Sequence, residues 1–333
     1  MPEQITENVY LISIPLENSP LKNLNAYLVR GRVRNLLIDT GYYTKSCIDV
    51  MRGCLKEIGV DMRETDIFLT HLHSDHCGMA GAIASSETTV YMSPADSRHL
   101  RDSYDPGFLD QTEAVYLSYG FSKEELIENR KNNPAVAYRQ PVLVPSVPVY
   151  DGQVIDLGGT RLTCVSTPGH TPGHMCLYDP ERKILFAGDH IIYDITPNIT
   201  SWTEMEDALG TYLDSLRRVR GLDMKLALSA HRRPVSDSRM RIDQLLSHHE
   251  ARLEDVMRIL QMQGGSGIVM NCYQIASYMK WSIRARNWEE FPVVQKFFAV
   301  GEAASHLDHL IALNKVRREC SEGIYYYHVL QPA

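Results

Sequence analysis

Four side chains that could bind a metal ion lie within six residues: His71, His73, Asp75 and His76. They follow the apolar run Ile67–Leu69, which is typical of a buried strand. Open α/β layers usually place their chemistry at the carboxyl ends of strands. His71 and His73 leave an extended backbone on the same side, whereas Asp75 and His76 follow where the chain turns. One metal ion would use two of these groups, and two ions would use all four.

Three more ligand-type residues each follow a strand-like apolar run: His170, Asp189 and His231. A lone histidine is more often a surface or core residue than a ligand. Ligand-type residues just past four apolar runs instead predict that the strand ends converge on one site. Imidazole and carboxylate ligands without thiolates suit Zn²⁺, and also Mn²⁺ or Fe²⁺.

These seven residues, in this order and spacing, resemble the metallo-β-lactamase superfamily. The resemblance covers roughly residues 5 to 262. It implies that a first divalent ion is bound by His71, His73 and His170. It also implies that Asp39 holds the ligand loop without binding metal itself.

The same resemblance implies a second ion bound by Asp75, His76 and His231, with Asp189 bridging the two ions. Asp75 and Asp189 would therefore be catalytic as well as ligands. Two bridged ions lie about 3.5–4 Å apart and share a water that loses its proton near neutral pH. That bridging hydroxide would attack a carbonyl or phosphoryl centre. In lactone-hydrolysing relatives a tyrosine a few residues after the bridging aspartate approaches the substrate, which makes Tyr193 a further candidate.

Other polar residues near these positions have two interpretations each. Arg232 and Arg233 either hold an anionic substrate group or form solvated salt bridges. His190 either lines the site or packs in the core. Cys77 is interpreted as a packing residue and His174 as a structural one.

Length and composition narrow the class of protein. At about 150 residues per domain, 333 residues suggest roughly two domains. The net charge of −7 argues against a general nucleic-acid-binding surface. No apolar run approaches the ~20 residues of a membrane span, and the first residues do not resemble a secretory signal. Seven cysteines without a C-x-x-C pattern suggest reduced thiols in the cytoplasm. A homo-oligomer is left open.

The pattern of the chain predicts an α/β fold, an αβ/βα metallo-β-lactamase sandwich with helices outside two facing sheets. In the first half, strands are expected over Val9–Ile14, Asn25–Val29 and Asn35–Asp39. Thr44 should cap a helix that ends at Gly59, and a short helix is expected over Gly78–Ala84. In the second half, strands are expected over Val154–Leu157, Arg161–Thr167, Met175–Tyr178, Lys183–Ala187 and Leu226–Ser229. Amphipathic helices are expected over Glu204–Val219 and Asp237–Met262.

Two regions lie outside the sandwich pattern. Residues 94–148 are a helical insertion into the catalytic domain, residues 1–263, and the insertion is either a lid over the site or a decoration away from it. Residues 264–333 begin with a glycine-rich linker and continue with a helix Cys272–Lys280, a helix from Pro292 and a hairpin. This order predicts a small winged-helix-like domain, whose balanced charge does not resemble that of a DNA reader.

The combined prediction is a cytosolic dinuclear zinc hydrolase that resembles glyoxalase II and acts on a thioester or other acyl ester, a small-molecule substrate. A phosphodiester hydrolase or endoribonuclease is the alternative, and a non-catalytic metal-binding effector is a further one. Iron or manganese could replace zinc.

Overall fold

The computed structural model describes residues 1–17, 19–235, 237–264, 268–282 and 285–330. Its first sheet has seven strands that lie in chain order. They are β1 (Glu3–Gln4), β2 (Val9–Pro15), β3 (Asn23–Val29), β4 (Asn35–Ile38), β5 (Thr65–Phe68), β6 (Val90–Met92) and β7 (Val147–Pro148). The pairs from β1 to β4 are antiparallel and those from β4 to β7 are parallel.

The second sheet has five strands in the order β12-β11-β10-β9-β8. They are β8 (Val154–Asp156), β9 (Arg161–Ser166), β10 (Met175–Asp179), β11 (Ile184–Gly188) and β12 (Leu226–Ser229). The inner faces of the two sheets share one hydrophobic core, in which Tyr27 meets Phe186 edge to face with ring centroids 5.7 Å apart.

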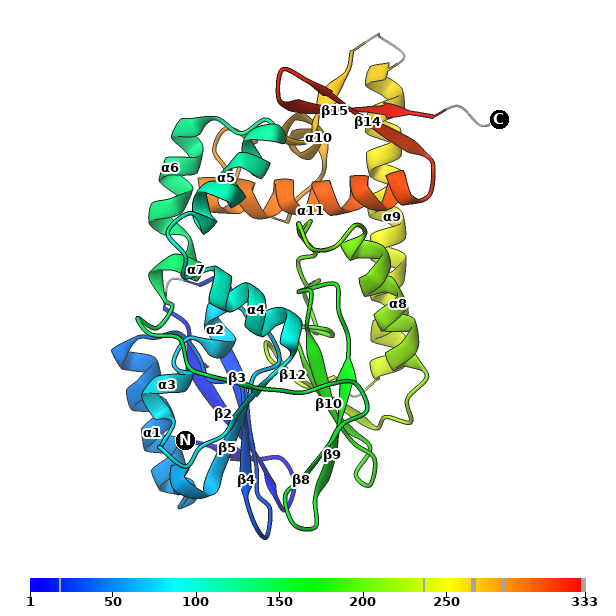
Figure 1. Ribbon diagram of the computed structural model, residues 1–333. Coiled ribbons are helices and arrows are strands. Elements are labelled where there is room, and N and C mark those ends of the chain that lie inside the picture. The colour runs from blue at the N-terminus through cyan, green and yellow to red at the C-terminus, as the bar shows by residue number, and fades with distance from the viewer. Residues whose placement is uncertain (18, 236, 265–267, 283–284, 331–333) are drawn as a thin grey trace.

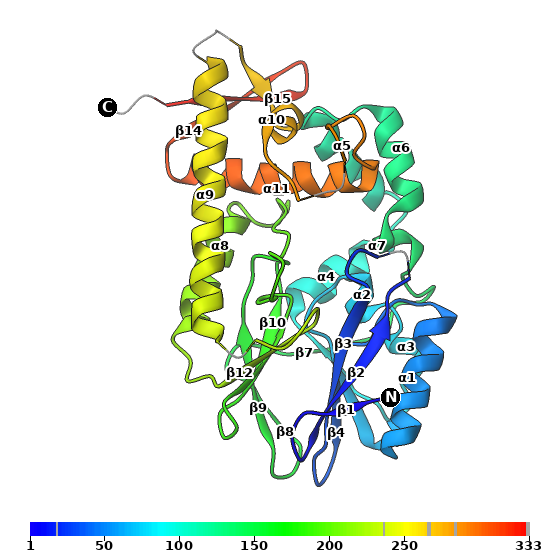
Figure 2. The ribbon, with the colours of Figure 1, turned by 180° about the vertical axis from the view of Figure 1, so that it is seen from behind.

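Helices cover the outer faces, as the predicted sandwich requires (Figures 1 and 2). Helix α1 (Lys45–Ile58) packs on the first sheet, and α8 (Ala208–Arg220) and α9 (Ser238–Gly264) pack on the second. The Thr44 cap and the left-handed Gly59 are confirmed. Helix α8 begins later than the predicted Glu204 because the Asp207 side chain accepts a hydrogen bond from the backbone N–H of Gly210 and caps the helix there.

The insertion forms α4 (Pro94–Asp102), α5 (Phe108–Ser118), α6 (Lys123–Asn132) and α7 (Pro134–Ala137). The C-terminal region forms α10 (Cys272–Tyr278), α11 (Val293–Ala312) and the sheet β13 (Met270–Asn271), β15 (Ile324–Val329), β14 (Val316–Ser321). Helix α10 ends at Tyr278 instead of the predicted Lys280. The predicted linker lies outside the described residues except for Gly264, which ends α9.

The insertion and the C-terminal region pack on each other around one hydrophobic cluster, which includes Tyr116, Leu126, Ile275, Val300 and Leu307. Helices α5 and α6 of the insertion and the C-terminal region form the upper part of the molecule in Figure 1. The predicted order of helices followed by a hairpin is present, whereas the winged-helix likeness and the domain boundaries stay predictions. In the part of the chain that the structure describes, no helix combines the length and apolarity that a membrane crossing needs.

Candidate metal centre

The loop after β5 carries the first four ligand-type residues. It turns into a helix at once, since α2 (Ser74–Cys77) begins directly after His73, and a second short helix, α3 (Ala80–Ile83), follows. The short helix predicted over Gly78–Ala84 is present as α3 with narrower bounds, whereas α2 was not predicted. Because Asp75 and His76 belong to α2 and His71 and His73 to the extended segment before it, the two pairs face different points. Helices α2 and α4 lie at the end of the sandwich that faces α11 (Figures 1 and 2).

His71, His73 and His170 form a first ligand group, with one ligand atom of each lying within 4.8 Å of the others. Nδ1 of His73 lies 3.0 Å from Nε2 of His71 and 3.1 Å from Nε2 of His170. When all three imidazoles are neutral, the single Nδ1 of His73 forms good hydrogen bonds to both of its neighbours only with difficulty. The three ring nitrogens can instead ligate one cation together.

Asp75, His76 and His231 form a second ligand group by the same criterion. Oδ2 of Asp75 lies 3.4 Å from Nε2 of His231 and 3.9 Å from Nε2 of His76. The structure thus brings together six of the predicted ligands in two adjacent groups.

Asp189 lies between the two groups and faces both. Its Oδ2 lies 3.6 Å from Nε2 of His170, in the first group. Its Oδ1 lies 3.6 Å from Nε2 of His76 and 3.5 Å from Nε2 of His231, in the second group. This is the arrangement that a bridging carboxylate requires.

The two ligand-type histidines of the second half, His170 and His231, are each oriented by a hydrogen bond at the ring nitrogen that faces away from the centre. Nδ1 of His170 donates to the carbonyl of Asn198 at 2.8 Å, and Nδ1 of His231 donates to the carbonyl of Asn23 at 2.9 Å. A carbonyl oxygen can only accept, so Nδ1 carries the proton and the lone pair of Nε2 faces the centre.

Asp39 orients His76 in the same way, with Oδ2 at 2.8 Å from Nδ1 of His76. It also accepts hydrogen bonds from the backbone N–H and the hydroxyl of Thr70. Asp39 therefore holds the ligand loop, as the resemblance implied. His174 is structural as predicted: its Nδ1 is bonded to the Thr167 hydroxyl at 2.8 Å, and its Nε2 accepts from the backbone N–H of Asp189 at 3.1 Å.

Burial and neighbouring charges determine the protonation states of these ligand-type residues. Burial lowers the pKa of His73 to about 3, so its ring is neutral at pH 7. Burial opposes the ionisation of Asp75, but His76 and His231 outweigh it and hold the pKa of this carboxyl at about 2. The pKa of Asp189 is likewise well below its ordinary value, since His231 and His76 outweigh the effect of burial.

Three atoms of the centre are buried and have no hydrogen-bond partner among the described residues: Nε2 of His76, Oδ1 of Asp189 and Nε2 of His231. Buried polar atoms in folded proteins nearly always have a partner. Because these three converge, divalent cations would satisfy them together, and the residues present fit a metal centre.

The contacts of Tyr193 in the structure are with other residues than the seven ligand-type ones. Its ring packs under the guanidinium of Arg233, 3.9 Å from the ring centroid, and within the described residues it makes no hydrogen bond to any of the seven. Its role at a substrate stays a prediction. His190 is fully buried, next to the ring of Tyr212, and belongs to the core.

Two residues that sequence reasoning missed border the first ligand group. The rings of Trp202 and His73 are stacked, with their centroids 6.3 Å apart. The Nε1–H of Trp202 also donates to the backbone carbonyl of His170 at 3.2 Å. His99 of α4 packs edge to face on Trp202 at 5.1 Å, so the insertion reaches the border of the centre. Neither residue follows a strand, and no pattern in the sequence marks them.

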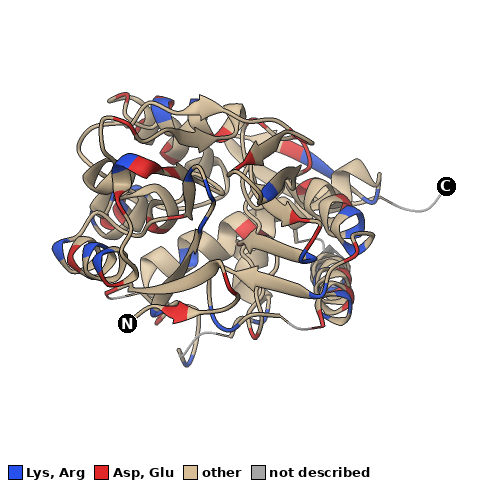
Figure 3. Cartoon of the chain, turned by 90° about the horizontal axis from the view of Figure 1, so that it is seen from below, with Lys and Arg blue, Asp and Glu red and all other residues tan. Residues whose placement is uncertain are grey.

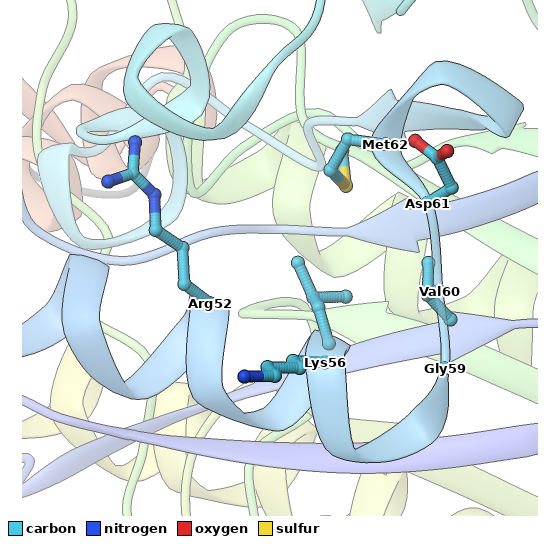
Figure 4. A pocket seen from close by; sticks show the side chains of 7 residues that line it. Arg52, Lys56, Gly59, Val60, Asp61 and Met62 are labelled. Atoms are coloured by element: carbon cyan, nitrogen blue, oxygen red, sulfur yellow. The ribbon is translucent and has the colours of Figure 1, made fainter.

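A surface groove at the end of α1 is separate from this centre (Figure 4). Its lining belongs to α1 and the turn that follows it, and includes Arg52, Lys56, Asp61 and Met62. It shares no residue with either ligand group.

Comparison with known proteins now defines the class. The family model described as the metallo-beta-lactamase superfamily matches residues 21–231, more than half of the chain. The chain belongs to this superfamily. Among solved structures, a metallo-beta-lactamase family protein from Thermus thermophilus has a TM-score of 0.81 and 26% identity, covering 98% of this chain and 100% of that one. The likeness therefore includes the insertion and the C-terminal region.

Curated relatives match this chain over only part of their own length. The lactamase-like protein adaB of Aspergillus niger is 28% identical over 263 residues, which are 78% of this chain and 66% of that protein. An acyl-coenzyme A thioesterase of Gallus gallus, MBLAC2, is 34% identical over 173 residues, 51% of this chain and 58% of that protein. Its Homo sapiens counterpart is 30% identical over 198 residues, 56% and 65% respectively. The matches span less than two thirds of each of these relatives.

Proposed function

We propose that this chain is a dinuclear metal-dependent hydrolase that acts on a thioester or other acyl ester, in the manner of glyoxalase II. The observation that carries the proposal is the position of Asp189, whose two carboxylate oxygens face the two ligand groups separately. The first group would hold one ion and the second group the other, with Asp189 shared between them.

When bound, two divalent ions of this kind lower the pKa of a water and polarise a carbonyl. Neutral imidazoles and ionised carboxylates are the forms that ligate a cation, and burial keeps His71, His73 and His170 neutral. In the second group the neighbouring carboxylates outweigh burial and raise the pKa of His76 and His231, so these two rings would each release a proton when a cation binds. Zinc suits this donor set, and iron or manganese would also fit it. Cys77 is not a nucleophile in this proposal: burial raises the pKa of its thiol, which donates to the carbonyl of Leu72.

An acyl substrate is favoured by the relatives and by the charge of the chain. The two MBLAC2 relatives are described as acyl-coenzyme A thioesterases. The net charge is −7, and Figure 3 shows basic and acidic residues interspersed rather than gathered by sign. A nucleic-acid polymer would be steered by an extended basic surface instead. A cytoplasmic location is part of the proposal, because all seven cysteines are free thiols.

The test is Asp189→Ala, compared with Asp214→Ala at an exposed position of α8. Hydrolysis of short- and long-chain acyl-coenzyme A is followed with a thiol-trapping dye, and bound metal is measured by mass spectrometry. We expect Asp189→Ala to lose more than about 100-fold in kcat/KM, corresponding to about 3 kcal/mol of transition-state stabilisation, together with bound metal, and Asp214→Ala to lose neither.

Three results would overturn the proposal. Full activity of the metal-stripped protein would exclude metal-assisted hydrolysis. Cleavage of bis-p-nitrophenyl phosphate or single-stranded RNA without thioester turnover would identify a phosphodiester hydrolase. Two bound ions without turnover of any of these substrates would identify a non-catalytic effector.

A further inference from the structure

The ligand His170 is held by one short loop at both its ring and its backbone. This loop, residues 198–202, lies between β11 and α8. The carbonyl of Asn198 accepts from Nδ1 of His170 at 2.8 Å, and the indole of Trp202 donates to the His170 carbonyl at 3.2 Å. The position of the 198–202 loop therefore sets the position of the His170 ring.

The 198–202 loop is in turn docked on α11, near the other end of the chain. The hydroxyl of Ser305 donates to the carbonyl of Ile199 at 2.5 Å, and the backbone N–H of Ser201 donates to the carbonyl of Gly301 at 3.1 Å. The approach is close, because a Cβ at Gly301 would lie 2.3 Å from Oγ1 of Thr200. The α11 backbone thus fixes the loop at several points.

The side chain of Asn198 makes the most direct link, because the backbone carbonyl of the same residue orients His170. Its amide donates to Oε2 of Glu302 on α11 at 3.0 Å. Oε1 of Glu302 is paired with Arg252 of α9 at 3.2 Å. Arg252 is fixed as well, stacking 4.2 Å from the ring centroid of Trp281 and donating to the carbonyl of Lys280 at 2.7 Å. Glu302 is therefore held on both sides.

We propose that Asn198 and Glu302 are positioning residues through which α11 sets the metal affinity of the first ligand group. The inference rests on the metal centre of the proposed function, but not on the substrate. The second ligand group has other supports, namely Asn23 for His231 and Asp39 for His76. The effect of α11 should consequently be selective for one of the two metal positions.

The test is a zinc titration of the metal-stripped full chain against a chromophoric chelator. Asn198→Ala removes the amide that Glu302 accepts from. Glu302→Gln leaves one oxygen for two donors, Asn198 and Arg252. Substitution of a partner that orients a metal ligand typically costs about 10–100-fold in metal affinity. We expect a loss of that size for one zinc equivalent in both variants, with the other equivalent unchanged.

Two sets of controls make the result specific. Glu125→Gln disturbs a comparable ion pair between α6 and α11, in which Glu125 pairs with Lys296 at 3.1 Å. No hydrogen bond or ion pair of Glu125 or Lys296 within the described residues involves the 198–202 loop. Glu125→Gln should leave both zinc equivalents unchanged. His170→Ala and His231→Ala identify which equivalent belongs to which ligand group, and the positioning variants should match His170→Ala.

The outcomes separate the inference from the proposed function. If the wild-type chain binds no zinc, the proposed metal centre itself fails. If it binds two ions and Asn198→Ala and Glu302→Gln bind both as tightly, only the inference fails. Equal weakening of both equivalents, or the same loss in Glu125→Gln, would show a general effect of stability and would also overturn it.

Discussion

Asp96 ties two ligand-bearing loops together although it is not one of the seven ligand-type residues. Its carboxylate accepts from the backbone N–H of Leu72 at 3.0 Å, beside the first loop. It also accepts from the Thr171 hydroxyl and the Gly173 N–H, both at 2.6 Å, beside His170. The side chain is fully buried, and burial raises the pKa of Asp96 to about 6 in spite of these hydrogen bonds.

This raised pKa predicts a pH-dependent contribution to stability. In the unfolded chain an aspartate has a pKa of about 3.9. The folded state binds the proton more tightly, so the contribution is complete below about pH 4 and is lost as the pH rises through about 6. Asp96→Asn cannot titrate. Its unfolding free energy relative to wild type should therefore rise by roughly 2 kcal/mol between about pH 4 and pH 7. This is less than the full difference at about 1.4 kcal/mol per pKa unit, because pH 4 lies close to the unfolded pKa.

Urea denaturation at the two pH values measures this difference, and Asp102→Asn, at the exposed end of the same helix, is the control. The lost hydrogen bonds of Asp96→Asn add an offset that is the same at both pH values. A difference that does not change with pH would contradict the raised pKa.

The turn between β9 and β10 depends on how closely α8 approaches it. Gly169, directly before His170, has φ +131°, and a Cβ there would lie 2.4 Å from Cβ of Tyr212 on α8. The turn that carries a ligand is thus packed against a helix with no room for a side chain.

Gly169→Ala should therefore cost more than backbone strain alone. A non-glycine residue at positive φ costs about 1–2 kcal/mol, and overpacking adds about 1–3 kcal/mol. Gly152→Ala is the matched control, because Gly152 has φ +75° but nothing within 4 Å of the built Cβ. We expect the loss of unfolding free energy to be larger for Gly169→Ala, with weaker zinc binding in that variant only. Equal losses in both variants would show that the contact with Tyr212 yields easily.

The insertion and the C-terminal region, far apart in the chain, share a single hydrophobic cluster. Tyr116 of α5 stacks on Phe297 of α11 with centroids 3.7 Å apart, and Leu126 of α6 is buried in the same cluster. Shared burial of this kind makes two segments unfold together.

Leu126→Ala tests this cooperativity by creating a cavity on the insertion side. The expected cost is about 2–5 kcal/mol. Amide exchange should become faster in α11 as well as in α5 and α6, as measured by hydrogen-exchange mass spectrometry. Ile127→Ala, on the exposed face of α6, should change neither. Faster exchange confined to residues 94–148 would show that the insertion is an independent unit.

The sequence alone predicted the sandwich, the caps at Thr44 and Gly59, and the seven residues that the structure brings together. Each of these depends on local information: an apolar run predicts a strand, and the ligand-type residue follows the run within a few positions. Within the second sheet β11 and β12 are parallel neighbours, so Asp189 and His231 follow at the same edge. The packing of the two sheets brings this edge to the loop after β5.

Only the tertiary structure placed Asp96, Trp202 and the 198–202 loop at the centre, and only it paired α5 and α6 with α11. None of these follows from a period or a spacing, because an apolar helix face does not specify which other face covers it. The same applies to a buried carboxylate such as Asp96, whose partners become adjacent only when α4 has packed against two separate loops. Local patterns fix what each segment can form, and the mutual fit of distant surfaces decides which segments meet.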